Sequence, residues 1–220
     1  MNVVILGATK GLGHEIVKYY HGQGCHTIEL GSSITYLHHQ GNRTLIPCDL
    51  SEPETVRQAI ETLDTMVIDH FFWVSGTIIT GEFKSGSSED LLRMIDINLR
   101  NALPLIHRVW ERLQEPGKKG KLVVISSSAG LKAKANEAVY VASKWAQVGL
   151  ARSIALESTN PDCKLSLILP GGMKTEFWNK QPHPDYQSFL DPDKVAQRII
   201  QFIDSQDKGY AELEIPRGSL

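Results

Sequence analysis

Short apolar runs alternate with longer segments of helical periodicity along the whole chain. The apolar runs, typical of strands buried on both faces, occupy residues 2–6, 26–30, 43–50, 66–76, 121–130, 164–172 and 210–216. Between them, apolar positions recur at helical spacing over residues 12–24, 51–63, 88–114, 136–158 and 191–205. This alternation predicts an α/β fold: a doubly wound, mostly parallel seven-stranded sheet with helices on both faces.

Several segments carry signals at their ends. The helical segment 51–63 opens with Ser51, and Pro53 and acidic residues follow in its first turn. The segment 88–114 is expected to be interrupted near Pro104. No linker or low-complexity stretch divides the chain, so residues 1–220 are expected to form a single domain. Sheets of this kind bind ligands beyond the carboxyl ends of their strands, which is where functional residues are sought.

Composition and charge narrow the range of partners. The net charge is −2 and the basic stretch at 117–121 is short, so we expect no nucleic-acid partner. No apolar stretch approaches the ~20 residues of a membrane helix, and the first apolar run is too short for a signal peptide. Cys25, Cys48 and Cys163 lie far apart in no metal-ligand spacing. We therefore expect reduced thiols, no metal site, no membrane contact and a cytoplasmic location.

A glycine-rich turn, GATKGLG, follows the first apolar run at residues 7–13. Gly7 allows a tight turn, Gly11 lets the backbone approach a phosphate, and Gly13 permits close contact between helix and sheet. The helix that begins here offers unpaired N–H groups and a positive dipole end to a pyrophosphate. A purely structural turn is the alternative, but the strand before and the helix after it favour phosphate binding.

Tyr140 and Lys144 lie four residues apart in the longest helical segment and therefore share one helix face. The pKa of an unperturbed tyrosine is ~10, which makes it a weak acid at neutral pH. A lysine ammonium ~4 Å away favours the phenolate by ~4 kcal/mol at an effective dielectric of ~20, or about three pKa units. This predicts a Tyr140 pKa near neutrality, suited to general acid–base work. An exposed pair without function is the alternative.

The glycine spacing together with Tyr140-x-x-x-Lys144 resembles the short-chain dehydrogenase/reductase family, and the resemblance covers nearly the whole chain. Three further features agree with it: Asn98 in DINLRNA, Ser127 thirteen residues before the tyrosine, and PGGMKT at residues 170–175. The resemblance implies a Rossmann-type fold and hydride transfer between a nicotinamide cofactor and a small carbonyl or alcohol substrate.

The resemblance also implies a role for each catalytic candidate. Tyr140 would exchange a proton with the substrate oxygen, and Ser127 would hydrogen-bond the same oxygen and stabilise developing charge. Lys144 would also hold the nicotinamide ribose hydroxyls. Asn98 would position a water that links Lys144 to bulk solvent. Without the resemblance, a capping role for Asn98 and a strand-end turn at Ser127 stay open.

Further cofactor contacts follow from the family pattern. Asp49 and Leu50 match an adenine-contacting pair, and Thr175 would reach the nicotinamide carboxamide. The full set of cofactor-binding residues implied is Gly7, Thr9, Lys10, Gly11, Leu12, Gly13, Ser32, Asp49, Leu50, Ser75, Gly76, Tyr140, Lys144, Pro170, Gly171, Met173 and Thr175.

The choice between NADP(H) and NAD(H) depends on the end of the second strand. The position that carries Asp or Glu in NAD sites is Gly31 here, followed by Ser32 and Ser33. No carboxylate would repel a 2′-phosphate, and Lys10 adds positive charge nearby. The arginine common after this strand is missing, and Glu29 is expected within the strand. We favour NADP(H), with NAD(H) as the alternative.

Two segments depart from the family pattern or vary within it. Leu6 replaces a threonine, and Trp73-Val74-Ser75-Gly76 replaces Asn-Asn-Ala-Gly, so modified packing is expected without loss of chemistry. The short segment at about 176–190 would be the substrate loop. Its aromatic residues either form apolar walls of the site or pack against the last helix: Phe177, Trp178, Tyr186 and Phe189.

Two functional classes remain open from the sequence. The favoured one is an NADP(H)-dependent oxidoreductase acting on a carbonyl or alcohol. The alternative is a cofactor-binding, redox-sensing protein with little catalysis. The family resemblance also implies a homodimer or homotetramer whose subunits pair through the segments 88–114 and 136–158.

Overall fold

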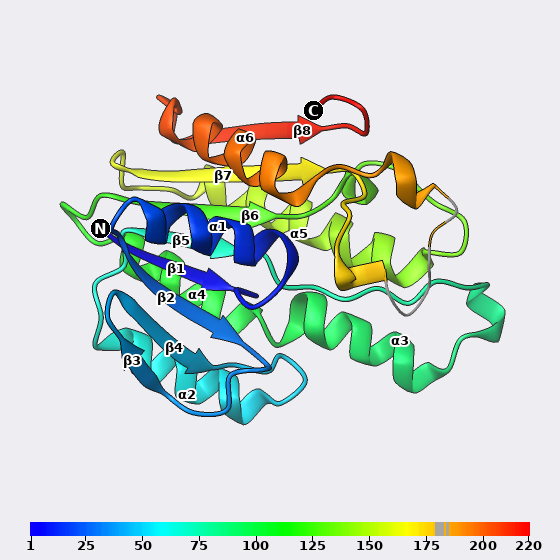
Figure 1. Cartoon of the computed structure of the whole chain (residues 1–220), viewed down its shortest axis with the longest axis horizontal. Helices are drawn as coiled ribbons and strands as arrows, with labels where there is room; N and C mark the ends of the chain where they lie inside the picture. Colours follow the sequence, from blue (N-terminus) through cyan, green and yellow to red (C-terminus); the bar gives the residue numbers. More distant parts are fainter. Residues whose placement is uncertain (179–182, 184) are drawn as a thin grey trace.

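Eight strands form one sheet in the order β3-β4-β2-β1-β5-β6-β7-β8 in the computed structural model, which describes residues 1–178, 183 and 185–220 (Figure 1). Every neighbouring pair is parallel except β3 with β4. The strands are β1 (Asn2–Leu6), β2 (His26–Gly31), β3 (His38–Gln40), β4 (Arg43–Pro47), β5 (His70–Trp73), β6 (Gly120–Ile125), β7 (Cys163–Pro170) and β8 (Tyr210–Ile215).

The expected doubly wound α/β fold is confirmed, with one strand more than the seven expected. The additional strand, β3, has three polar and mostly exposed residues. It therefore carries no apolar run, and its pairing with β4 defines it instead.

The helices cover both faces of the sheet (Figure 1). Apolar residues of α1 and α6 pack on one face, and those of α2, α4 and α5 pack on the other. The helices are α1 (Gly11–Gly22), α2 (Pro53–Asp64), α3 (Ser88–Ile95), α4 (Leu103–Leu113), α5 (Ala138–Leu156) and α6 (Pro192–Asp204). Among the described residues, no helix is both long and apolar enough to span a bilayer.

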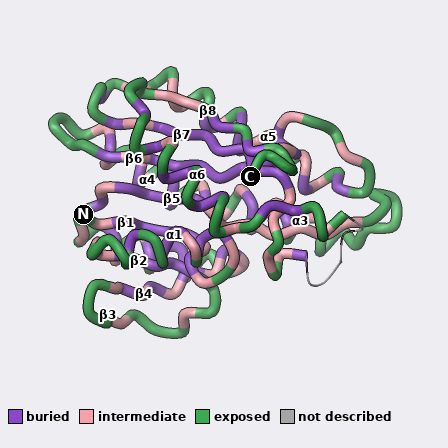
Figure 2. Tube along the Cα trace, turned by 45° about the horizontal axis from the view of Figure 1, so that its top comes forward, coloured by how far each residue is buried: buried purple, intermediate pink, exposed green. Residues whose placement is uncertain are grey.

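Alternation along the central strands explains their burial on both faces. In β1, Val3 and Ile5 pack toward α1 and α6, whereas Val4 and Leu6 pack toward the opposite helices. Successive side chains of a strand point to opposite faces, so a continuous apolar run fills both cores. Figure 2 shows the resulting buried band through the central strands.

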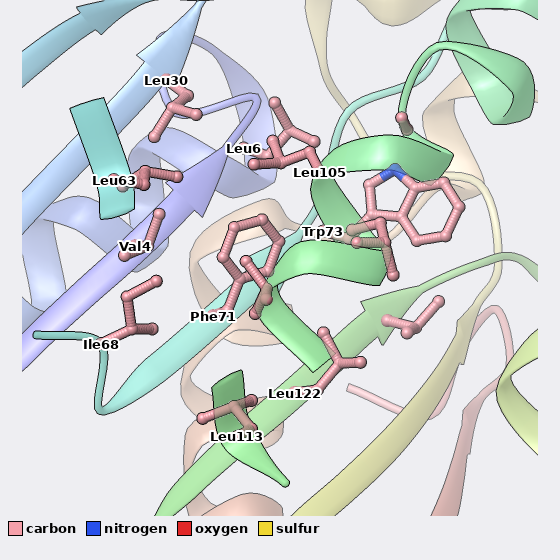
Figure 3. Close-up of a cluster of buried hydrophobic side chains, with 14 of the residues drawn as sticks. Val4, Leu6, Leu30, Leu63, Ile68, Phe71, Trp73, Leu105, Leu113 and Leu122 are labelled. Atoms are coloured by element: carbon pink, nitrogen blue, oxygen red, sulfur yellow. The ribbon is translucent and has the colours of Figure 1, made fainter. Parts of the chain in front are cut away.

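Two of the departures from the family pattern are neighbours in the sheet. Leu6 of β1 is the register partner of Trp73 of β5. Both are almost fully buried in one apolar cluster, which also contains Leu105 of α4 (Figure 3). The indole Nε1 of Trp73 has no hydrogen-bond partner within the described part of the chain. Apolar packing therefore joins the two central strands directly below the ligand-binding edge of the sheet.

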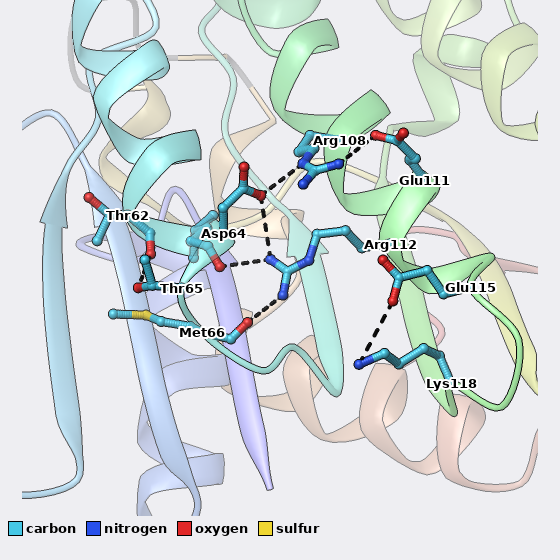
Figure 4. Close-up of polar contacts among 10 residues, drawn as sticks. Thr62, Asp64, Thr65, Met66, Arg108, Glu111, Arg112, Glu115 and Lys118 are labelled. Carbon is cyan, nitrogen blue, oxygen red and sulfur yellow. Dashed lines mark hydrogen bonds and ion pairs between the residues drawn. The ribbon is translucent and has the colours of Figure 1, made fainter.

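The end of α2 is tied to α4 by arginine side chains (Figure 4). Arg112 donates to the backbone carbonyl oxygens of Leu63, at 2.7 Å, and Met66. Arg108 donates to the Asp64 carboxylate at 2.8 Å. Cationic side chains that bind the last carbonyls of a helix satisfy groups that lack intrahelical partners. These contacts hold α2 and α4 together under the sheet.

The helical segment 88–114 is interrupted near Pro104, as the sequence indicated, and the interruption lies a few residues before the proline. A π-helical turn, Asp96–Arg100, separates α3 from α4, and Pro104 lies in the first turn of α4. Proline is tolerated there because the first N–H groups of a helix have no intrahelical acceptor. The π turn carries Asn98, which is fully buried.

Candidate active site

A cavity of about 620 Å³ opens beyond the carboxyl ends of β1 and β5. The strand order reverses here, since β1 lies between β2 on one side and β5 on the other. Of the predicted site residues, all except Gly13 and Asn98 line this cavity: Gly7, Thr9, Lys10, Gly11, Leu12, Ser32, Asp49, Leu50, Ser75, Gly76, Ser127, Tyr140, Lys144, Pro170, Gly171, Met173 and Thr175.

The glycine turn closes one end of the cavity. Gly7 has a φ of 92°, and a Cβ added there would lie 2.8 Å from the Cα of Ser75. A Cβ on Gly13 would lie 2.0 Å from the Gly7 carbonyl oxygen, so glycine at this position permits α1 to pack on β1. Lys10 precedes α1 and provides no side-chain cap. The N-terminus of the helix is therefore left for an anion.

The opposite wall carries Ser127, Tyr140 and Lys144. Ser127 follows β6, while the tyrosine and the lysine lie in the first two turns of α5. All three are buried, with 8%, 7% and 3% of their surfaces exposed. The Lys144 ammonium nitrogen lies 5.7 Å from the centroid of the Tyr140 ring. The structure thus brings the predicted proton donor, its serine neighbour and the lysine to one place.

The predicted pKa of Tyr140 is wrong in direction. Burial raises the pKa of this tyrosine to about 12; a hydrogen bond with Ser127 opposes the rise, and the charge of Glu137 adds to it. Burial lowers the pKa of Lys144 to about 7. Desolvation therefore outweighs the attraction that the helical spacing suggested, because burial also disfavours the charge on the lysine. Tyr140 is a protonated phenol at neutral pH.

Asn98 lies behind this wall and ties together three segments. Its side-chain oxygen accepts the Thr77 N–H at 2.7 Å, and its amide nitrogen donates to the Thr77 carbonyl oxygen at 2.9 Å. The same nitrogen donates to Ser143 Oγ at 3.0 Å, and Ser143 donates in turn to the Tyr140 carbonyl oxygen. Asn98 thereby fixes the chain after β5 against the first turns of α5.

Lys144 and Asn98 are linked through Gln147, a residue that sequence reasoning missed. Gln147 Oε1 accepts from Lys144 Nζ at 3.0 Å, and Gln147 Nε2 donates to the Asn98 carbonyl oxygen at 2.8 Å. The resemblance implied a different partner for Lys144, a water that Asn98 positions between the lysine and bulk solvent. The available signal was the spacing of Tyr140, Lys144 and Gln147, which places all three on one helix face.

The edge of the cavity near β2 holds the residues expected to select the cofactor. Ser32 lines the cavity. A Cβ added to Gly31 would lie 2.8 Å from Thr9 Cγ2. Glu29 is buried within β2, as expected, and forms a bidentate ion pair with Arg43 at 2.6 and 2.7 Å. Glu29 does not line the cavity.

We expect Arg43→Met to lower the free energy of unfolding by about 1–3 kcal/mol, because it leaves the buried Glu29 carboxylate without its charged partner. The ratio of kcat/KM for NADPH and NADH should stay as in the wild type. Urea denaturation and kinetics with both cofactors check the two expectations. Arg57→Met, which removes only exposed ion pairs on α2, is the control and should change stability little. An altered cofactor ratio in Arg43→Met would mean that Glu29 contacts the ribose.

Lys10 is part of an ion pair that the sequence did not predict. Its ammonium lies 3.0 Å from the carboxylate of Glu176, and both side chains are more than half exposed. Such a pair contributes ~0–1 kcal/mol, so a bound phosphate can compete for the lysine. The contact joins the glycine turn to the segment that follows β7.

Two of the four aromatic residues of the segment 176–190 form walls of the cavity, and among the described residues the ring contacts of the other two are not with the last helix, α6 (Pro192–Asp204). Phe177 and Trp178 line the cavity, and the Phe177 ring lies 6.0 Å from that of Tyr140. Phe189 instead packs against Trp178, Tyr186 and Arg217. Residues 179–182 and 184 of the predicted loop lie outside the described residues.

Sequence reasoning missed three cationic residues that line the cavity: Arg93, Lys134 and Arg217. Arg93 comes from α3, Lys134 from the chain before α5, and Arg217 from the chain after β8. Surface lysines and arginines are common, and no spacing in the sequence distinguishes these three from the rest. Only the tertiary fold brings them to one cavity.

Comparison with known proteins agrees with this geometry. Residues 1–185 match the short chain dehydrogenase family. The chain is 27% identical over 224 residues to a 3-oxoacyl-(acyl-carrier-protein) reductase of Rickettsia conorii, covering 94% of this chain and 90% of that protein.

Two solved structures share the fold across nearly the full length of both chains. One is a 4-hydroxyisoleucine dehydrogenase mutant complexed with NADH and succinate, with a TM-score of 0.85 and 26% identity, covering 100% of this chain and 98% of that one. The other is a variant of ElxO with NADPH bound, with a TM-score of 0.82, 21% identity and coverage of 99% and 98%. The chain belongs to the short-chain dehydrogenase/reductase family and is an NAD(P)-dependent oxidoreductase acting on CH–OH and C=O groups.

Proposed function

We propose that the protein is an NADP(H)-dependent carbonyl reductase or alcohol dehydrogenase in which Tyr140 is the general acid and base. The observation that carries this proposal is that Ser127, Tyr140 and Lys144 line the same cavity as the glycine turn. A dinucleotide in that cavity would present its reactive ring to the tyrosine while its phosphates meet α1.

The residues present fit a nicotinamide dinucleotide. Gly76 carries no side chain where it lines the cavity, and a Cβ there would lie 3.6 Å from Lys144 Nζ. The Ser75 hydroxyl is buried with no hydrogen-bond partner in the described part of the chain, and Ser75 lines the cavity. An unpaired buried hydroxyl is unfavourable until a ligand satisfies it.

The side chains then divide the acid–base chemistry. The cofactor supplies or accepts the hydride when bound. Because the pKa of Tyr140 is about 12, the phenol holds its proton at neutral pH and can donate it to a carbonyl oxygen that gains charge. The Ser127 hydroxyl donates to the same oxygen, and the Lys144 ammonium stabilises the phenolate that remains. Alcohol oxidation needs the same groups in reverse, with the Tyr140 phenolate taking the proton, and the raised pKa of Tyr140 disfavours that form at neutral pH.

The proposal is tested by incubating the purified protein with NADPH and a panel of aldehydes, ketones and quinones and measuring the consumption of NADPH. Turnover of any carbonyl supports the proposal. Tight NADPH binding without turnover of any panel member would favour the redox-sensing alternative. No binding of either dinucleotide would contradict both.

The preference for NADP(H) rests on the absence of a carboxylate at the end of β2. We expect Gly31→Asp to weaken NADPH binding ten- to a hundredfold, the effect of about 1.5–3 kcal/mol, and to improve NADH relative to NADPH. Gly31→Ala introduces the same Cβ crowding against Thr9 without the charge, so it is the matched control. The difference between the two variants in kcat/KM for each cofactor isolates the carboxylate. Equal effects of the two variants, or a wild-type preference for NADH, would contradict the assignment.

The assembly and location also remain proposals. Exposed apolar side chains on α5, Trp145 and Leu156, support the dimer or tetramer expected from the family. Light scattering with size-exclusion chromatography measures the oligomeric state. A cytoplasmic location remains a prediction.

A further inference from the structure

The side-chain amide of Gln147 is buried, and both its oxygen and its nitrogen form a hydrogen bond within the protein. The residue is 0% exposed and lies three positions after Lys144 on α5. Its Oε1 accepts from Lys144 Nζ at 3.0 Å, while its Nε2 donates to the Asn98 carbonyl oxygen at 2.8 Å. Both groups that it contacts are themselves fully or almost fully buried.

The chemistry of the two partners permits one orientation of this amide. A lysine ammonium only donates hydrogen bonds, and a backbone carbonyl oxygen only accepts them. Reversing the amide would place the NH₂ group against Lys144 and the amide oxygen against the oxygen of Asn98. A carboxamide is therefore the neutral group that satisfies both, whereas an aliphatic side chain leaves two buried polar groups unpaired.

The acceptor end of the bridge is held rigidly. Asn98 lies in the π turn, and its side chain contacts the backbone of Thr77 at both ends of the amide. It also donates to Ser143, the residue before Lys144. Gln147 thus connects the lysine to a carbonyl of a residue that is held by the chain after β5 and by α5. The position of the ammonium is fixed through the same connection.

We propose that Gln147 is the positioning residue for Lys144: its side chain holds the lysine ammonium in place and supports its charge. This inference rests on the proposed function for its effect on turnover. Its effect on the lysine itself does not depend on that function.

Burial and the hydrogen bond to Gln147 act on the pKa of Lys144 in opposite directions. Burial is the cause of the lowered pKa of Lys144, and no carboxylate contributes to it. Among the described residues, Tyr140 and Gln147 of α5 contact the Lys144 side chain, and Gly76 after β5 lies close to its ammonium. A hydrogen bond to the charged form raises a lysine pKa, so removing the acceptor lowers it further. A carboxylate in its place raises it.

The test uses two substitutions that should act in opposite directions. Gln147→Leu should lower the pKa of Lys144, and Gln147→Glu should raise it. NMR titration of the lysine side chains, with the Lys144 signal assigned by its loss in Lys144→Met, measures both shifts. Gln206→Leu removes another buried amide, which binds Ser166 and backbone carbonyls outside the cavity, and is the matched control. It should leave the Lys144 titration unchanged.

Turnover provides a second readout. Gln147→Leu should lower kcat ten- to a hundredfold, the effect of losing one hydrogen bond to a charged group. Activity should fall with rising pH as Lys144 loses its proton, so this limb of the pH profile should move to lower pH in Gln147→Leu and to higher pH in Gln147→Glu. Gln206→Leu should keep the wild-type profile even if its melting temperature falls.

Two outcomes overturn the inference: an unchanged Lys144 titration in both Gln147 variants, or equal shifts in Gln206→Leu and Gln147→Leu. Failure of the proposed function has a different signature. In that case the wild type reduces no carbonyl, while the Lys144 titration still shifts in opposite directions in the two Gln147 variants.

Discussion

Tyr140→Phe should lower kcat by at least ~10²-fold and leave NADPH affinity nearly unchanged. The Tyr140 phenol lines the cavity together with Ser127, and it is protonated at neutral pH because burial raises its pKa to about 12. Phenylalanine retains the ring, and hence the packing against Phe177, but has no proton to donate. Steady-state kinetics and NADPH titration by fluorescence separate turnover from binding.

A second buried tyrosine provides the control. Tyr20 of α1 is 3% exposed, and its hydroxyl contacts His70 at 3.3 Å outside the cavity. Tyr20→Phe should lose some stability with its contact to His70 but keep the wild-type kcat. If Tyr140→Phe retains more than half the wild-type turnover, Tyr140 is not the proton donor. If both variants lose turnover equally, the loss reports on folding and the assignment also fails.

The residues predicted for the site came together because motifs stand at the ends of predictable elements. Gly7 follows an apolar strand, and Ser127 follows another; in a parallel sheet these ends meet at one edge. Gly13 and Asn98 are the two that do not line the cavity. Both act behind it, one by allowing α1 to approach β1 and the other by joining the π turn to α5. Helix and strand patterns alone do not distinguish a residue that lines the cavity from one that supports its walls.

Other features depend on contacts that a linear pattern does not contain. The pKa of Tyr140 was predicted from the helical spacing, which places Lys144 on the same helix face. The spacing does not show how deeply the two side chains are buried, and burial is what raises the pKa of the tyrosine. β3 has no apolar alternation and exists through its pairing with β4. Gln147 donates a hydrogen bond to the carbonyl oxygen of Asn98, which lies forty-nine residues earlier in the chain. Each of these is a tertiary property, decided by which segments pack together.

Lys144→Met should reduce both kcat and cofactor affinity, because we propose that this one side chain serves both the tyrosine and the ribose. Methionine retains the length and the apolar stem of lysine but not the ammonium. We expect kcat to fall at least ~10²-fold as stabilisation of the phenolate is lost. We expect the Kd for NADPH to rise ten- to a hundredfold with the loss of a charge-assisted hydrogen bond. Gln147 Oε1 would also lose its donor, so stability should fall slightly.

The matched control for this variant is Lys121→Met. Lys121 of β6 is partly buried, and its ammonium donates to the Ile203 carbonyl oxygen at 2.7 Å, outside the cavity. Its pKa is also lowered by burial, so the substitution removes a comparable lysine without touching the site. Lys121→Met should keep wild-type kcat and Kd. If Lys144→Met changes only the Kd for NADPH, the lysine binds the ribose but does not support the acid–base chemistry of Tyr140. If it changes only kcat, the ribose contact is wrong and the electrostatic role stands alone.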